Sequence, residues 1–282
     1  MNAKAVWCLV LCVVVGGGLI LTSCSSGPQP PAPGTPAFFW AAARETYAAG
    51  DYEKTAQHLG RICNTRSDYT ARAEPWFLIL TSGMAKANME LADAFEAGRK
   101  ARPYNPTPYR RQIALFQTYA NGYALQFAQV LGDIEKSGKD PKIALDFTFP
   151  TGSSMMSPGM NKIGMGTLPT PDVLEDIRKQ HLKTGVLQAT CRAVGAAEDS
   201  AKAEQMFRAG AVQVPREVFM LAMASALQET GQLFSRTKLD DPERLKLFNT
   251  RALETLKTLP ESKETTALNN KIQKALKLVS TK

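Results

Sequence analysis

Apolar residues recur every three or four positions along most of this chain, which is the spacing of one face of an α-helix. The first two segments with this pattern are residues 37–49 and 53–63, and Gly50-Asp51-Tyr52 separates them. Two helical segments joined by a short glycine-containing turn predict an antiparallel helical hairpin.

The same pattern continues as far as residue 136. Residues 76–88 and 91–102 predict a second pair of helices, with only Met89-Glu90-Leu91 as a turn between them. Residues 109–135 predict one long helix. We therefore expect a helical region over residues 37–136.

The helical pattern stops over residues 137–170, where residues 143–149 favour a short extended segment. A loop of this length is uncommon in a compact domain unless it is functional or flexible. Methionine makes adaptable apolar contacts, so the segment is interpreted either as a contact for a partner or apolar ligand, or as a flexible insertion between two helical halves. Its methionines are Met155, Met156, Met160 and Met165.

A second helical region is predicted over residues 171–282. Thr170-Pro171-Asp172 and Asp241-Pro242-Glu243 each place a capping side chain before a proline and an acid, which favours a helix start. Residues 218–227 are almost wholly apolar and predict the central buried helix of this half. The expected helices cover residues 171–193, 200–209, 215–227, 241–259 and 263–279. The whole pattern predicts an all-α fold of antiparallel helical hairpins, stacked as a solenoid or bundle, with a long central loop.

The first 36 residues follow a different pattern. Lys4 precedes an apolar run over residues 5–20, which is shorter than the ~20 apolar residues of a membrane-spanning helix. A basic end followed by a short apolar run is typical of a removed signal segment. Residues 25–36 are rich in proline, and they predict an extended spacer with a length of roughly 3 Å per residue.

The end of the apolar run, Leu21-Thr22-Ser23-Cys24, resembles the lipobox of a bacterial lipoprotein signal peptide. The resemblance implies that residues 1–23 are removed, that Cys24 is acylated, and that residues 24–36 tether the protein to membrane lipid. Ser25 and Ser26 follow Cys24, and no aspartate stands next to it. By the same resemblance, the absence of that aspartate implies that the protein is sorted to the periplasmic face of the outer membrane in a diderm host. The alternative is an ordinary secretory signal with a chance cysteine.

Gly50-Asp51-Tyr52, with Ala43 on the helix before it, resembles the turn of a tetratricopeptide-like repeat. Thr55 departs from the alanine of that pattern, whereas Asn105-Pro106 fits its terminal proline. The resemblance implies stacked hairpins with a concave groove for a protein partner. The residues expected to contact a partner, in the groove or in the methionine-rich loop, are Trp40, Arg44, Tyr47, Phe77, Arg111, Met155, Met156, Met160 and Met165.

The formal net charge of +8 changes this picture little. In an envelope compartment a mild positive excess favours anionic lipid or an acidic partner over nucleic acid, or it serves solubility alone. Apart from Cys24, the mature chain keeps Cys63 and Cys191. Disulfides are permitted in such a compartment, so these two residues are either bridged or are buried free thiols.

The sequence carries no recognisable catalytic motif. His58 and His181 each lack a second histidine or cysteine at metal-ligand spacing. Cys63 lies on a different helix face from His58, so the pair does not form an activated nucleophile. We therefore expect no enzyme activity, no cofactor and no metal.

Two functions remain open at this point. The first is a lipid-anchored envelope protein that acts as a helical-repeat interaction scaffold, as in outer-membrane or secretion assembly. The second is a small-molecule-binding accessory lipoprotein of a transport system. An open groove with exposed aromatic side chains favours the first, whereas an enclosed pocket favours the second.

Overall fold

The predicted all-α class is confirmed by a computed structural model, which describes residues 30–137, 140–152, 157–197 and 199–280. Over these residues the chain forms ten α-helices and one two-stranded sheet. The helices are α2 (Pro36–Ala48), α3 (Tyr52–Cys63), α4 (Thr70–Ala101), α5 (Thr107–Ser137), α6 (Pro158–Gly164), α7 (Pro171–Ala193), α8 (Ser200–Phe207), α9 (Arg216–Gly231), α10 (Pro242–Lys257) and α11 (Lys263–Ser280). The predicted signal segment and Cys24 lie outside the described residues.

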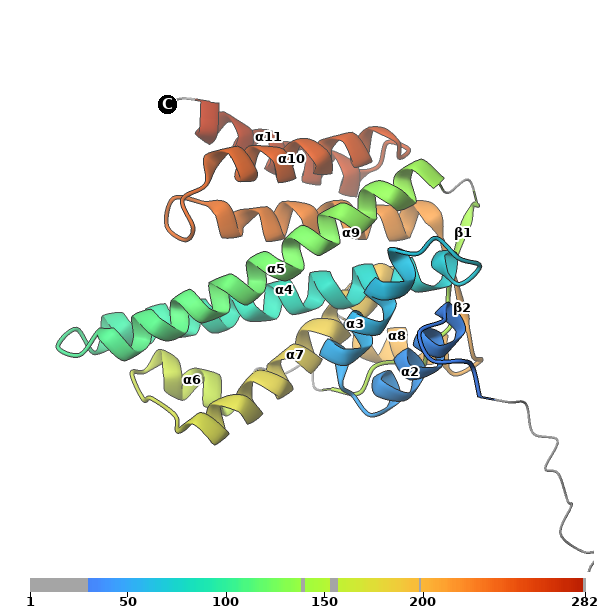
Figure 1. Ribbon diagram of the computed structural model, residues 1–282. Coiled ribbons are helices and arrows are strands. Elements are labelled where there is room, and N and C mark those ends of the chain that lie inside the picture. The colour runs from blue at the N-terminus through green and yellow to red at the C-terminus, as the bar shows by residue number, and fades with distance from the viewer. Residues whose placement is uncertain (1–29, 138–139, 153–156, 198, 281–282) are drawn as a thin grey trace, which may run out of the picture.

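Helices α2 and α3 form the first hairpin that the sequence predicts (Figure 1). The side chain of Thr35 accepts a hydrogen bond from the Phe38 amide at the start of α2. Asp51 accepts one from the Lys54 amide at the start of α3. Gly50, in the turn between them, has a φ of +71°, a left-handed conformation that favours glycine. These local signals define the hairpin.

The second predicted hairpin is wrong, because α4 is one continuous helix through the expected turn at Met89-Glu90-Leu91. That turn contains no glycine or proline, and these three residue types all favour helix. Met89 and Leu91 are also buried, so the core packs against the helix where the turn was expected. The long helix predicted next is confirmed as α5, which lies antiparallel to α4 (Figure 1).

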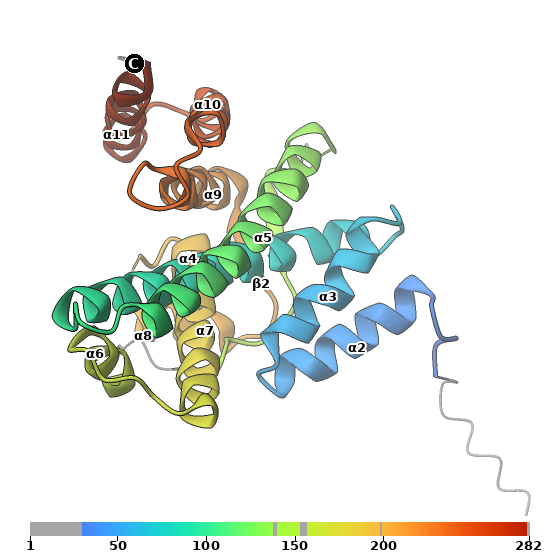
Figure 2. The same ribbon diagram turned by 60° about the vertical axis from the view of Figure 1, so that its left-hand side comes forward.

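Helix α4 lies at the centre of the molecule. Helices α3, α5, α6, α7 and α9 all pack against it. Figure 2 shows α2 and α3 on one side of the α4–α5 pair and α9 to α11 on the other. The main core includes Trp76, Phe127 and Phe219, and a smaller core surrounds Phe95. Residues of both predicted helical regions therefore share one core.

The second half of the chain follows its predicted pattern. Asp241 caps α10 by accepting a hydrogen bond from the Arg244 amide, and Pro242 opens the helix. The apolar segment expected to be buried lies in α9, where Phe219 and Leu227 are fully buried. Helices α9, α10 and α11 stack beside one another (Figure 1).

The segment predicted as a loop contains a strand, β1 (Lys142–Leu145), which overlaps the extended segment expected over residues 143–149, and helix α6, which was not predicted. Strand β1 pairs antiparallel with β2 (Val212–Pro215), which was also not predicted. Helix α6 is capped by Ser157, whose side chain accepts a hydrogen bond from the Gly159 amide. The described part of the segment is therefore ordered by contacts with distant parts of the chain.

Phe147, just after β1, fixes this segment to the first hairpin. Its ring lies 4.7 Å from the ring of Tyr47 and 5.1 Å from those of Trp40 and Trp76, measured between centroids. Aromatic pairs at such separations contribute about 0.5–1.5 kcal/mol beyond their burial. No helix among the described residues combines the length and apolar character that a bilayer crossing requires.

Helix α7 crosses α4 at a pair of glycines. A Cβ atom added to Gly83 would lie 2.6 Å from the Gly185 carbonyl oxygen, and one added to Gly185 would collide with the Gly83 carbonyl oxygen. Beside this crossing, Lys86 Nζ donates to Gln188 at 2.9 Å. The two backbones therefore touch without intervening side chains.

We predict that Gly83→Ala lowers the free energy of unfolding by at least about 2 kcal/mol, because a methyl group against a carbonyl oxygen cannot be relieved by a rotamer change. Gly122→Ala is the matched control, since a Cβ there meets nothing within 4 Å. Helix propensity should make that variant more stable by roughly 0.5–1 kcal/mol. Urea unfolding measures both changes, and a Gly83→Ala protein as stable as the parent would contradict the close crossing.

Candidate functional site

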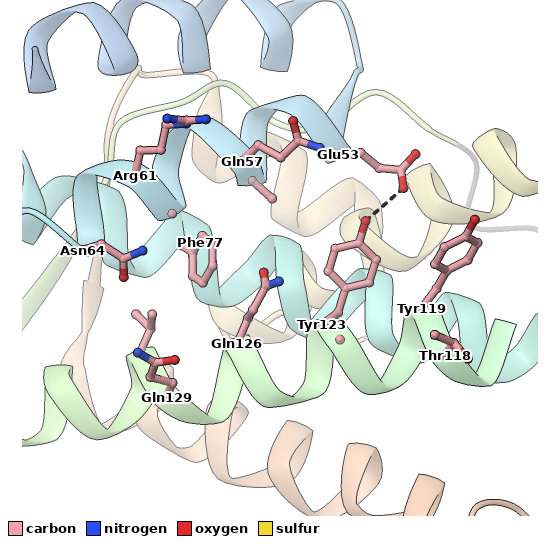
Figure 3. Close-up of a pocket in the computed structure, with 14 residues that line it drawn as sticks. Glu53, Gln57, Arg61, Asn64, Phe77, Thr118, Tyr119, Tyr123, Gln126 and Gln129 are labelled. Carbon is pink, nitrogen blue, oxygen red and sulfur yellow. Dashed lines mark hydrogen bonds between the residues drawn. The ribbon is translucent and has the colours of Figure 1, made fainter. Parts of the chain in front are cut away.

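A cleft of about 630 Å³ opens between α3 and α5. Gln57 and Arg61 on α3 lie opposite Tyr123 and Gln126 on α5 (Figure 3). Phe77 of α4 forms part of the base and is buried. Helix α3 approaches α4 closely there, because a Cβ on Gly60 would lie 3.1 Å from the Phe77 ring.

Polar and aromatic side chains line the open walls of this cleft. Tyr119 keeps 42% of its surface exposed. Gly122 leaves room beside it, since a Cβ there meets nothing. Four exposed amide side chains line the same walls and make no hydrogen bond with any residue that the structure describes: Gln57, Asn64, Gln126 and Gln129. An amide group both donates and accepts hydrogen bonds, so these walls match the groups of an extended polypeptide backbone.

A charged network closes one end of the cleft. Tyr123 donates a hydrogen bond to Glu53 at 2.9 Å (Figure 3). Arg178 of α7 donates to both oxygens of Glu53, at 2.9 and 2.7 Å, and to Glu175 at 2.8 Å. The Arg178 side chain is only 15% exposed, and bidentate pairs of this kind are stronger than neutral hydrogen bonds. The network therefore holds α3, α5 and α7 in a fixed relation.

Burial and neighbouring charges determine the protonation states of Tyr123 and Arg178. Burial raises the pKa of Tyr123 above its usual value, and the charge of Glu53 raises that pKa further. Hydrogen bonds with Glu175 and Glu53 raise the pKa of Arg178. Tyr123 therefore remains a hydrogen-bond donor and Arg178 a cation at any physiological pH.

A second cleft, of about 520 Å³, adjoins the first and shares Glu53 and Gln57 with it. Lys54, Lys179 and Lys183 line this second cleft between α3 and α7. The combined groove thus has an amide-rich part and a lysine-rich part.

Of the residues predicted to contact a partner, Phe77 lines the cleft. Trp40 and Tyr47 lie in the core instead, and the Tyr47 hydroxyl donates to the Thr148 carbonyl. Arg44 and Arg111 are exposed but lie outside the cleft lining.

The methionines predicted to contact a partner or ligand do not share one surface in the structure. Met160 is buried in the smaller core, whereas Met165 is 72% exposed. Neither lines the cleft. Met155 and Met156 lie outside the described residues.

Most residues of the cleft were not predicted from the sequence. Its α5 wall is formed by residues that recur every three or four positions: Thr118 and Tyr119, Gly122 and Tyr123, Gln126, and Gln129 and Val130. These positions form one helix face of amides, aromatic residues and a glycine. This spacing is present in the sequence, but no contact with a partner was predicted for this face.

The two remaining cysteines are free thiols, so the structure has no bridge between Cys63 and Cys191. Burial raises the pKa of Cys63 to about 12 and that of Cys191 to about 11. Both thiols therefore stay protonated at neutral pH, in the weakly nucleophilic form. Within the part of the chain that the structure describes, no group of three or more His, Cys, Asp or Glu side chains is placed to hold a metal ion.

Comparison with protein-family models, with curated proteins and with solved structures gives no match for this chain.

We predict that Glu53→Gln lowers the free energy of unfolding by about 1–3 kcal/mol, because Arg178 and Tyr123 lose a charged acceptor. Glu45→Gln is the control, since Glu45 is exposed on α2 and forms no ion pair with a described residue. Urea unfolding at neutral pH measures both variants. Equal stability of the two would show that the network does not hold the helices together.

Proposed function

We propose that this chain is a lipid-anchored envelope protein whose helical body holds a segment of a partner protein in the cleft between α3 and α5. The observation that carries the proposal is the open cleft, with the exposed ring of Tyr119 and four amide side chains that lack partners among the described residues. Tyrosine is enriched at protein interfaces because it combines a large apolar ring with a polar group.

The shape of the cleft supports a polypeptide over a small molecule. Pockets for small molecules usually bury 70–90% of their ligand. In this cleft the amide-bearing side chains and Tyr119 are exposed along both walls. A polypeptide segment can lie along such walls, pair its backbone with the amides, and continue beyond either end.

The sequence supports the anchored location. The resemblance of Leu21-Thr22-Ser23-Cys24 to a lipobox implies acylation of Cys24, and two or more fatty chains give stable membrane attachment. The proline-rich residues between Cys24 and α2, which begins at Pro36, would separate the helical body from the lipid surface. The cleft would then be accessible to another envelope protein.

Cys24→Ala is expected to release the protein from the membrane fraction without changing its unfolding midpoint, because acylation needs the thiol and the helical core does not. Fractionation of host cells followed by urea unfolding measures both properties. A variant that stays in the membrane fraction would contradict the lipid anchor.

A photo-reactive residue placed at Gln126 is expected to cross-link a partner in the native cell. Gly122→Trp should reduce that cross-linking at least fivefold, since the indole fills the cleft at a position with free space. Gly122→Ala should leave it unchanged. A photo-reactive residue at Leu247, which is 53% exposed on α10, is the control for nonspecific capture.

The identity of the captured protein is read by mass spectrometry. Cross-linking from Gln126 that is insensitive to Gly122→Trp, or no stronger than cross-linking from Leu247, would overturn the proposed partner cleft.

A further inference from the structure

A separate cavity of about 750 Å³ lies where α4 begins and α5 ends, beside strand β1. It shares no lining residue with the partner cleft. Its walls come from the α3–α4 connection, the first turns of α4, the last turns of α5, β1 and the start of α9. The volume falls within the range of small-molecule sites.

Glu74 on the α4 wall is unusual for a charged residue. It is only 8% exposed and makes no hydrogen bond or ion pair with any residue that the structure describes. Burial and the nearby charge of Asp133, on the α5 wall, raise the pKa of Glu74 to about 7, although the charge of Arg66 acts in the opposite direction. The charge of Glu74 also contributes, after burial, to the raised pKa of the Cys63 thiol.

Glu74 is therefore buried near a second carboxyl group, and the Arg66 charge that acts on it forms no ion pair with it. A buried carboxylate that lacks a partner costs free energy, and a second carboxylate nearby increases that cost. A positively charged ligand group would lower it by taking the place of the proton.

The same cavity has basic side chains on other walls. Arg72 already pairs with Asp146 at 2.5 Å, and Arg216 donates to the Ile134 carbonyl at 2.9 Å. Arg66 and Lys142 are exposed and form no ion pair with any described residue. These two cations are available to an anionic ligand group.

A ligand with only a positive charge would be repelled by Arg66 and Lys142. A ligand with only a negative charge would be repelled by Glu74 and Asp133. We propose that this cavity binds a small zwitterion, with its ammonium group on Glu74 and its carboxylate on Arg66 and Lys142. Free α-amino acids and short peptides both carry this pair of charges, at different separations. The site is independent of the proposed partner cleft.

Isothermal titration calorimetry on the full chain, purified in a mild detergent at pH 7.5, tests the proposal. The probes are L-alanine, L-alanyl-L-alanine and L-alanyl-L-alanyl-L-alanine, with propylamine and propionate as single-charge controls. We expect at least one zwitterion to bind tenfold more tightly than either control, and the preferred length distinguishes an amino acid from a peptide. The proposal would be overturned if no zwitterion bound. It would also be overturned if propylamine or propionate bound as tightly as every zwitterion.

Variants then locate the binding. Glu74→Gln and Arg66→Gln should each weaken binding of the preferred zwitterion at least tenfold, whereas Glu254→Gln, on the exposed face of α10, should have no effect. Urea unfolding at pH 8 checks that Glu74→Gln is folded. Its midpoint should be no lower than that of the parent, because a neutral amide replaces a buried carboxylate. A folded Glu74→Gln variant that binds with the parent affinity would disprove the assignment.

Discussion

Where α4 and α7 cross, Gly83 and Gly185 bring two helix backbones into direct contact. A side chain at either position would push the helices apart. Similar close approaches surround α4: a Cβ on Gly98 would collide with the carbonyl oxygen of Ile163 in α6, and Gly60 of α3 faces the Phe77 ring. The spacing of the helices around α4 is therefore set by missing side chains as much as by the large residues of the core.

The cleft between α3 and α5 depends on this arrangement. Its two walls belong to α3 and α5, which pack on α4. Arg178, which α7 supplies, joins these walls through Glu53 and its partner Tyr123. If α7 moved away from α4, Arg178 would be withdrawn from Glu53, and the end of the cleft would open. The close crossing in the core thus positions a charged network at the surface.

Local signals in the sequence predict most of the helices correctly. Asp51 and Asp241 cap the helices that follow them, and Gly50 adopts the left-handed turn. The error at Met89-Glu90-Leu91 arose because the repeat resemblance required a turn where the residues themselves favour helix. Strand β2 was missed because its pairing with β1 is a contact between distant segments.

The cleft was harder to predict than the fold. An amphipathic pattern does not say which aromatic residues of a helix lie in the core, so Trp40 and Tyr47 were expected at a groove, whereas Tyr119 and Tyr123 were not expected there. The ion pair of Glu53 with Arg178 joins residues 125 positions apart, and no local spacing indicates it. Glu74 and Asp133 are brought to one cavity by the antiparallel pairing of α4 and α5.

Native-state hydrogen exchange tests the central role of the α4–α7 crossing most directly. The account predicts that amides near Gly83 in α4 and near Gly185 in α7 exchange most slowly, and only through global unfolding. Both segments should respond equally to added urea. Exchange near Gly185 through a local opening, as fast as in the last turns of α10, would contradict it.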